Sequence, residues 1–176
     1  HSVSDEATYA HMFGWLIAYP SNAEDAKGLL RTALRGDDPT FFFEHRALLD
    51  TSEGRRPYPG DEYCLPFGKA AQLTQGDELT LVTWGGMISR CLEAAKPFAG
   101  RISLLDLRTI IPWDQEAVLE SVRRTGKVLV VHEDTLTAGF AAEIIAVIAS
   151  QAFTFLDAPA ERLAPPDVPI PYNARL

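Results

Sequence analysis

The sequence predicts an α/β fold, with a mainly parallel sheet covered by helices on both faces. Three short, mainly apolar runs, residues 79–84, 102–107 and 128–131, have the length of strands. Between them lie stretches with helical periodicity, long enough to carry the chain back across a sheet. Strands connected in this way pair in parallel, so we expect both faces of the sheet to be buried.

The first third of the chain shows the same alternation. Residues 15–19 predict a buried strand that ends at Pro20, and residues 40–43 predict a second strand. Neither shows the alternation of a half-solvated strand, which indicates a sheet covered on both faces. Between them, Ser21 and Glu24 have the spacing of a capping box, which predicts a helix starting at Asn22. The apolar positions of this helix follow helical spacing: Ala26, Leu29, Leu30, Ala33 and Leu34.

A change of composition suggests a domain boundary. Residues 51–66 concentrate turn residues and charge without any period, so we interpret them as a linker between residues 1–50 and 67–176. In the second part, Asp114 should cap a helix that ends at Gly126. Two further helical faces are expected, formed by Ile88, Cys91, Leu92 and Ala95 and by Phe140, Ile144, Ile145 and Ile148. The proline-rich tail should be irregular.

Composition and charge exclude several classes of protein. The chain has 176 residues, 47% of them hydrophobic and 23% charged, which is typical of a globular protein. Its formal net charge of −8 makes nucleic acid an unsuitable partner and favours basic ones. No apolar run approaches the roughly 20 residues that cross a bilayer. Cys64 and Cys91 lie far apart without metal-type spacing, so neither a disulfide nor a metal site is indicated.

Local motifs do not name a reaction. The signatures of dinucleotide, nucleoside triphosphate, zinc-protease and serine-hydrolase sites are absent. His11 and His45 flank predicted element ends, where a solvated or capping role is the default. His132 and Glu133 directly follow the strand 128–131, and ligands gather at the carboxyl ends of strands in open α/β sheets. The spacing leaves both a functional site and a hydrogen-bonded loop support open.

Several longer segments resemble a known family. They are HSVS (1–4), YAH (9–11), AKGLL (26–30), DLRTIIPWD (106–114), VHE (131–133), LTAGFAAE (136–143) and FLDAP (155–159). In this order they resemble the beta subunit of branched-chain 2-oxo acid dehydrogenase, over nearly the whole chain. The resemblance implies that residues 1–50 finish a transketolase-like pyrimidine-binding domain. Residues 67–176 would then form a transketolase C-terminal domain.

The resemblance also implies a reaction. Such enzymes decarboxylate 2-oxo acids and acylate a lipoyl group, and the segment IIPWD (110–114) favours branched-chain substrates of the 3-methyl-2-oxobutanoate type. A pyruvate dehydrogenase beta subunit and a non-catalytic docking or assembly module remain alternatives. Deoxyxylulose-phosphate synthase and transketolase share the fold more distantly, but they keep both halves on one longer chain. What precedes His1 in the parent protein would discriminate between an enzyme and a module.

Cofactors and partners are implied in the same way. The family uses thiamine diphosphate and magnesium, held mainly by the alpha subunit and by a segment upstream of the HSVS motif. We therefore expect the chain to be a fragment that is inactive alone. The implied partners are an alpha subunit and a second beta subunit, in a heterotetramer, and the dihydrolipoyl transacylase core. The implied location is the cytoplasm of a bacterium or the mitochondrial matrix of a eukaryote.

Five positions are assigned roles from the resemblance. His1 is the expected catalytic proton donor during acyl transfer, although Val3 replaces the glutamine of the family motif. Potassium is expected at Ala33, Gly36 and Asp38, and a helix cap at Gly36 without an ion is the alternative. Glu133 is the expected docking carboxylate for the transacylase core, unless it bridges within its own loop. No residue is assigned to binding thiamine diphosphate.

One further departure concerns backbone geometry. Ala138 stands where the family motif has a glycine. We therefore expect a conformation without positive φ at this position.

Overall fold

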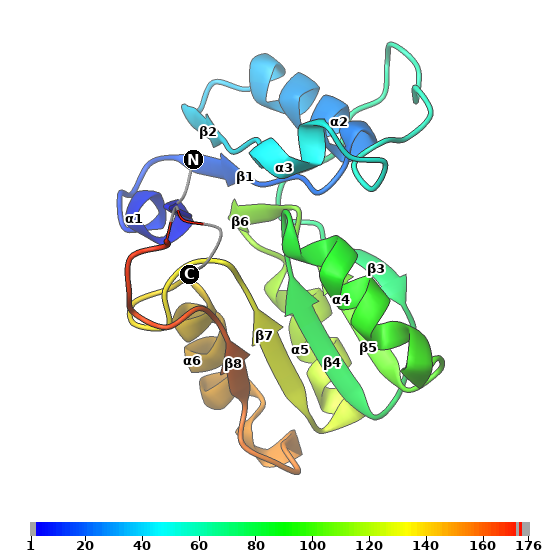
Figure 1. Ribbon diagram of the computed structural model, residues 1–176, viewed down its shortest axis with the longest axis vertical. Coiled ribbons are helices and arrows are strands. Elements are labelled where there is room, and N and C mark those ends of the chain that lie inside the picture. The colour runs from blue at the N-terminus through cyan, green and yellow to red at the C-terminus, as the bar shows by residue number, and fades with distance from the viewer. Residues whose placement is uncertain (1–2, 172, 174–176) are drawn as a thin grey trace.

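Two sheets form the framework of the protein. The computed structural model describes residues 3–171 and 173 (Figure 1). The smaller sheet has the order β2-β1-β6, in which β1 (Leu16–Ala18) pairs in parallel with β2 (Thr40–Phe42) and antiparallel with β6 (Thr109–Ile111). The larger sheet has the order β3-β5-β4-β7-β8. Its strands are β3 (Ala71–Thr74), β4 (Leu79–Thr83), β5 (Ile102–Asp106), β7 (Val128–Val131) and β8 (Glu161–Leu163).

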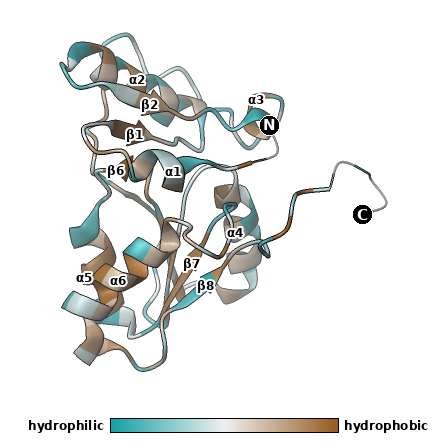
Figure 2. Cartoon of the chain, turned by 90° about the vertical axis from the view of Figure 1, so that its left-hand side faces the viewer, coloured by the Kyte–Doolittle hydropathy of each residue, from teal (hydrophilic) through white to brown (hydrophobic). Residues whose placement is uncertain are grey.

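The larger sheet has the predicted parallel arrangement with helices on both faces. Only its edge strand β3 runs antiparallel to its neighbour. On one face, α4 (Met87–Ala95) packs Ile88 and Cys91 against Leu81, Leu104 and Val131. The other face is covered by α5 (Gln115–Thr125) and α6 (Ala141–Gln151), which bury apolar side chains with the strands, among them Val118, Val122, Ile144 and Ile148. Figure 2 shows apolar residues along β7 and on parts of both helices. The fold class is therefore confirmed.

Both predicted ends of α5 are confirmed. The carboxylate of Asp114 accepts a hydrogen bond from the backbone N–H of Ala117 at 3.2 Å, so it caps the first turn. At the other end Gly126 adopts a left-handed conformation with φ +67°, which a glycine takes without steric cost. The same carboxylate also accepts from the N–H of Ala70 at 3.0 Å, and this bond anchors the start of the larger sheet.

The predicted cap of α2 (Ala23–Arg35) is wrong by one residue. Asn22, rather than Ser21, accepts a hydrogen bond from the N–H of Asp25 at 3.0 Å, and its amide donates to the Asp25 carboxylate at 2.8 Å. Two overlapping capping patterns exist in this segment, because Asn22 and Asp25 have the same spacing as Ser21 and Glu24. The structure uses the second pattern because the Ser21 hydroxyl is engaged with Asp106, at 2.5 Å.

The apolar face of α2 is only partly buried. Leu29 is fully buried, whereas Leu30 and Leu34 are 45% and 78% exposed. Both exposed leucines border a groove of about 230 Å³ together with Phe42 of the small sheet. Leu30 and Leu34 therefore stay exposed, although they keep the helical spacing of the other apolar positions.

The remaining helices are short, and three strands escaped prediction. The short helices are α1 (Glu6–Ala10), α3 (Arg46–Leu49) and the 3-10 turns Lys96–Phe98 and Phe153–Phe155. The missed strands β3, β6 and β8 are three or four residues long and lie at the edges of their sheets. Because β8 pairs with β7, the tail after residue 158 is not wholly irregular.

The segment 51–66 has no helix or strand, as expected, but it is bound to α2. Lys27 donates to the carbonyls of Gly60 and of Asp61, and Arg31 pairs with Glu62 at 2.8 Å. The ring of Tyr63 lies so close to Gly28 that a Cβ there would be 2.7 Å from it. The basic side of α2 therefore holds this segment in one path.

Two further expectations concern membrane-spanning helices and the two cysteines. None of the helices in the described ranges is long and apolar enough to cross a membrane. Cys64 and Cys91 are both free thiols.

Candidate functional site at the junction of the two sheets

The carboxyl ends of the parallel strands face the smaller sheet. β4, β5 and β7 run in the same direction and end at Thr83, Asp106 and Val131. The segments that follow these ends reach the N-terminal part of the chain in two ways. β6 pairs with β1, and side chains from both parts of the chain form hydrogen bonds or ion pairs with one another. The junction therefore brings together residues far apart in sequence.

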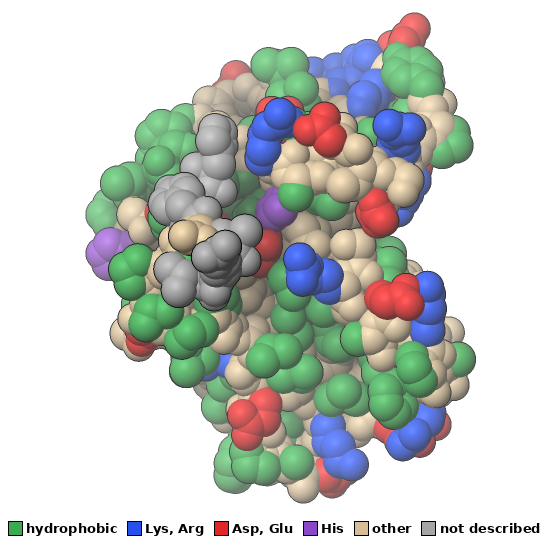
Figure 3. Space-filling view, viewed as in Figure 1, with side chains coloured by type: hydrophobic (Ala, Val, Ile, Leu, Met, Phe, Trp, Pro, Cys, Tyr) green, Lys and Arg blue, Asp and Glu red, His purple; other side chains and the backbone are tan. Residues whose placement is uncertain are grey.

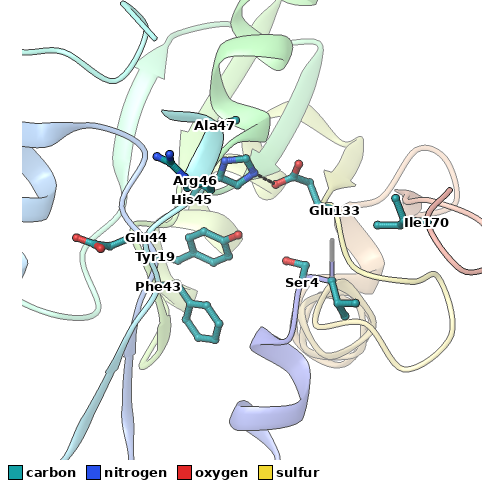
Figure 4. A pocket seen from close by; sticks show the side chains of 10 residues that line it. Ser4, Tyr19, Phe43, Glu44, His45, Arg46, Ala47, Glu133 and Ile170 are labelled. Atoms are coloured by element: carbon teal, nitrogen blue, oxygen red, sulfur yellow. Dashed lines mark ion pairs between the residues drawn. The ribbon is translucent and has the colours of Figure 1, made fainter. Parts of the chain in front are cut away.

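A cavity of about 620 Å³ lies at this junction (Figure 4). Its walls come from Ser4 near the start of the chain, residues 43–47 after β2, Glu133 after β7, and Ile170 in the tail. Tyr19, directly after β1, directs its hydroxyl toward Ser4 and Glu133 (Figure 4). The cavity thus combines a basic imidazole, a carboxylate, a phenol and a hydroxyl with apolar walls.

An ion pair spans the cavity. His45 Nε2 lies 2.8 Å from Glu133 Oε2, and the two side chains are 20% and 34% exposed. The hydrogen bond to Glu133 raises the pKa of His45, against the opposing effect of burial. The imidazole fits here because residue 86 is glycine, since a Cβ at that position would lie 2.5 Å from Nε2. Figure 3 shows a histidine beside an acidic side chain at the centre of this face.

Tyr19 forms the wall beside this pair. Its ring stacks on Phe43 with centroids 5.2 Å apart, and it lies against Gly85, where a Cβ would be 2.7 Å from the ring. Gly85 also has φ +56°. Burial raises the pKa of Tyr19 to about 12, so its hydroxyl stays protonated at neutral pH. The glycine pair 85–86 therefore leaves space for two rings from the N-terminal part of the chain.

A second polar group joins β5 to α2. Arg108 forms a two-point ion pair with the buried Asp25, with both nitrogen–oxygen distances at 2.9 Å. Asp106 is 1% exposed and accepts hydrogen bonds from the Ser21 hydroxyl and from the Arg108 N–H. Burial raises the pKa of Asp106 to about 7. The DLRT motif therefore fixes α2 against the larger sheet.

The titration of Asp106 should appear in the pH dependence of stability. Its folded pKa lies above the value of about 3.9 in unfolded chains, so its contribution is full below about pH 4 and is lost as pH rises through 7. We expect Asp106→Asn to flatten the decline of unfolding free energy between about pH 5 and pH 8, because the amide does not titrate. The amide oxygen can accept from the Arg108 N–H, and the amide NH2 can donate to the Ser21 hydroxyl. Urea unfolding at both pH values would check this. An equally steep decline in the variant would contradict it.

A third group is centred on Trp84, the residue after β4. Its indole N–H donates to Glu6 at 3.0 Å, and Glu6 is fully buried and also accepts from Ser4. Burial raises the pKa of Glu6. On the other side the indole stacks on His132, with centroids 5.7 Å apart. Burial lowers the pKa of His132 to about 4, so this imidazole is neutral, and its ring nitrogens have no hydrogen-bond partner among the described residues.

The expectation for Ala138 is wrong. This residue adopts φ +61°, in the left-handed region that glycine favours. The following Gly139 is indispensable for a different reason, because a Cβ there would lie 2.5 Å from the His132 ring and 2.4 Å from the carbonyl of Thr135. The loop therefore closes tightly over His132, and the left-handed conformation of Ala138 costs about 1 kcal/mol.

The structure brings some of the predicted site residues together and separates others. Glu133 lies in the junction cavity, and it is partnered by His45 rather than by a residue of its own loop. Ala33 and Asp38 border the separate groove beside α2. His1 lies outside the described residues.

His45 is the residue that sequence reasoning missed. Its place at the end of a predicted element suggested a solvated or capping role, but its side chain makes no cap hydrogen bond and pairs across the junction instead. A signal did exist in the paired glycines 85–86, which permit close approach of other groups. That signal does not identify which residue approaches.

Comparison with known proteins identifies the family to which the chain belongs. Residues 68–176 match the family described as transketolase, C-terminal domain, and residues 1–51 match transketolase, pyrimidine binding domain. The chain belongs to the transketolase C-terminal domain family. A solved structure described as a split gene transketolase, an inactive beta4 tetramer, has the same fold. Its TM-score is 0.78, at 20% identity, over 96% of this chain and 54% of that one.

Curated relatives of this transketolase-family chain are beta subunits. It is 42% identical to the 2-oxoisovalerate dehydrogenase subunit beta of Bacillus subtilis, over 98% of the chain and 53% of that protein. The mitochondrial 2-oxoisovalerate dehydrogenase subunit beta 2 of Arabidopsis thaliana is 38% identical over 97% of the chain and 48% of its own length. The pyruvate dehydrogenase E1 component subunit beta of Rickettsia bellii is 38% identical over 100% and 54%. The chain spans about half the length of the curated relatives it matches.

Proposed function

We propose that the chain is part of the beta subunit of a thiamine diphosphate-dependent 2-oxo acid dehydrogenase of the branched-chain type. The observation that carries this proposal is the 42% identity to a 2-oxoisovalerate dehydrogenase beta subunit over 98% of the chain. The junction geometry supports it, because the DLRT and VHE motifs supply Arg108, Asp106 and Glu133 to the contacts between the two parts. Residues 1–50 then complete a pyrimidine-binding domain, residues 51–66 link the two domains, and residues 67–176 form the C-terminal domain.

The pyruvate dehydrogenase beta subunit is the second candidate. Its support is the relative from Rickettsia bellii at 38% identity. The two candidates share the fold and differ in the side chain of the 2-oxo acid. The substrate preference of the assembled enzyme therefore decides between them, and an assembly that binds partners without decarboxylating either acid would indicate a docking module.

The cofactor would be held mainly outside this chain. Thiamine diphosphate supplies a thiazolium that stabilises the charge left by decarboxylation. Following the family resemblance, we propose that the alpha subunit and the upstream segment hold the magnesium. In the described part of this chain, no group of three His, Cys, Asp or Glu side chains could hold a metal ion. Our assignment for this chain is His1, as proton donor to the lipoyl sulfur during acyl transfer.

The proposed activity has a direct test. The full-length beta subunit, assembled with its alpha subunit, should acylate a lipoyl group with a higher kcat/KM for 3-methyl-2-oxobutanoate than for pyruvate. His1→Ala should lower the acylation rate at least about a hundredfold, the usual effect of a general acid, and leave cofactor binding unchanged. His11→Ala serves as the matched control. Equal rates for the wild type and His1→Ala would refute the role of His1.

Potassium at the end of α2 is a separate proposal. The carbonyl of Ala33 accepts one hydrogen bond from the Gly36 N–H, and that of Asp38 accepts one from Thr40, so each oxygen keeps a lone pair for a cation. Gly36 has φ −90°, so the helix does not end in a left-handed cap. We expect the assembled enzyme to melt a few degrees higher in potassium than in tetramethylammonium chloride. Identical melting temperatures would rule the site out.

Partners follow from the same assignment. We propose a heterotetramer of two alpha and two beta subunits that docks on a dihydrolipoyl transacylase core, in a bacterial cytoplasm or a mitochondrial matrix. The net charge of −8 favours a basic docking domain. We propose Glu133 as a docking carboxylate because its side chain is 34% exposed. Within this chain, His45 contacts one of its two oxygens, Oε2.

A further inference from the structure

We infer that His45 competes with a basic side chain of the docking partner for Glu133, so that docking releases a proton from His45. This inference rests on the proposed docking role of Glu133. It adds a means of regulation: the partner would bind more tightly as pH rises. The sequence segments involved are the turn after β2 and the end of β7, which no local motif connects.

The geometry makes the competition direct. The Nε2 atom of His45 lies 2.8 Å from Oε2 of Glu133, on the side of the carboxylate that faces the cavity. An arginine or lysine bonded to both oxygens needs that position. The cavity of about 620 Å³ is large enough to admit such a side chain. A basic partner must therefore displace the imidazole or bind a carboxylate whose charge is already neutralised.

The surrounding charges set the direction of the effect. His45 is approached by Glu133 from β7 and by Arg90 from α4, and the hydrogen bond to Glu133 outweighs the opposing influences of burial and Arg90 on its pKa. Glu44 and Arg46 line the same cavity beside it, and Tyr19 faces it as a neutral phenol. Below its raised pKa, His45 is charged and holds Glu133 in a strong ion pair. Above that pKa only a neutral hydrogen bond remains, so Glu133 keeps a net negative charge for the partner.

The turn after β4 gives an independent way to break the pair. A Cβ on residue 86 would lie 2.5 Å from His45 Nε2 and 2.8 Å from the two ring carbons beside it. Gly86 has φ −64° and ψ −23°, which alanine adopts without strain. Gly86→Ala should therefore push the imidazole away from Glu133 and leave both titratable groups in the chain.

The test measures docking as a function of pH. The complete alpha–beta assembly would be titrated by calorimetry with the isolated subunit-binding domain of its transacylase, from about pH 5.5 to pH 8.5. We expect Kd to fall with rising pH, by up to tenfold per pH unit, the limit for one released proton. Repeating the titration in buffers of different ionisation enthalpy should show up to about one proton released per bound domain.

The variants separate the inference from the proposal beneath it. In His45→Gln and in Gly86→Ala, the pH dependence and the proton release should both disappear, and binding at low pH should become tighter than in the wild type. His11→Gln, the matched control, should behave as the wild type does. If Glu133→Gln binds as the wild type does at every pH, the docking role itself is wrong. If Glu133→Gln weakens binding but His45→Gln and Gly86→Ala keep the wild-type pH dependence, the competition by His45 is refuted while the docking role stands.

Discussion

Replacing Arg108 with alanine is expected to lower the free energy of unfolding by about 3–5 kcal/mol. Arg108 pairs with Asp25 through two contacts of 2.9 Å, and the Asp25 side chain is only 5% exposed. Removing the guanidinium leaves that carboxylate buried with the Asn22 amide as its remaining side-chain donor. The cost arises from the uncompensated buried charge rather than from the value of the pair itself. Urea unfolding followed by circular dichroism would measure the loss.

Two further variants make this prediction specific. Arg46→Ala removes an arginine that is 60% exposed and pairs with Asp50, so it should cost less than about 1 kcal/mol. In the background of Asp25→Asn, where no charge is left buried, the cost of Arg108→Ala should shrink markedly. A loss that is the same in both backgrounds would show that Arg108 acts by packing and not by charge.

Replacing Trp84 with alanine is expected to destabilise the protein by about 3–5 kcal/mol. The indole is 2% exposed and packs between His132 and Phe140. Its N–H donates a hydrogen bond to Glu6. Trp84→Phe retains a ring and removes only the donor, so it should cost about 1–3 kcal/mol, because a buried acceptor loses a partner. Thermal unfolding of both variants would measure these losses.

An exposed aromatic residue provides the control for Trp84. Phe13 is 96% exposed, so Phe13→Ala should change stability by less than about 0.5 kcal/mol. If Trp84→Phe is as stable as the wild type, the hydrogen bond to Glu6 contributes nothing measurable. In that case the connection between α1 and the larger sheet rests on packing alone.

The elements of the larger sheet were predictable because each carries its signal locally. The runs 79–84, 102–107 and 128–131 are rich in apolar residues, as expected of strands buried between two helical layers. Asp114 and Gly126 indicated where α5 begins and ends, because a capping residue bonds to backbone groups only three or four residues away in the chain. The edge strand β8 was missed because a short strand with one partner and exposed side chains has no such pattern.

Sequence alone also led to the family, through the order of motifs such as DLRTIIPWD and VHE, and to Glu133 as a residue of interest. It determined the three central strands of the larger sheet and the longer helices α2, α4, α5 and α6, because periodicity and caps depend on neighbours in the chain. Tertiary structure alone decided how the cap of α2 forms, how Ala138 is strained, and that His45 meets Glu133. The choice between Ser21 and Asn22 depended on Asp106, which lies 85 residues away from Ser21. His45 became part of the site because Gly86 leaves space for its ring beside the end of β7. Such contacts depend on which strand ends lie side by side, and no local pattern of residues encodes that.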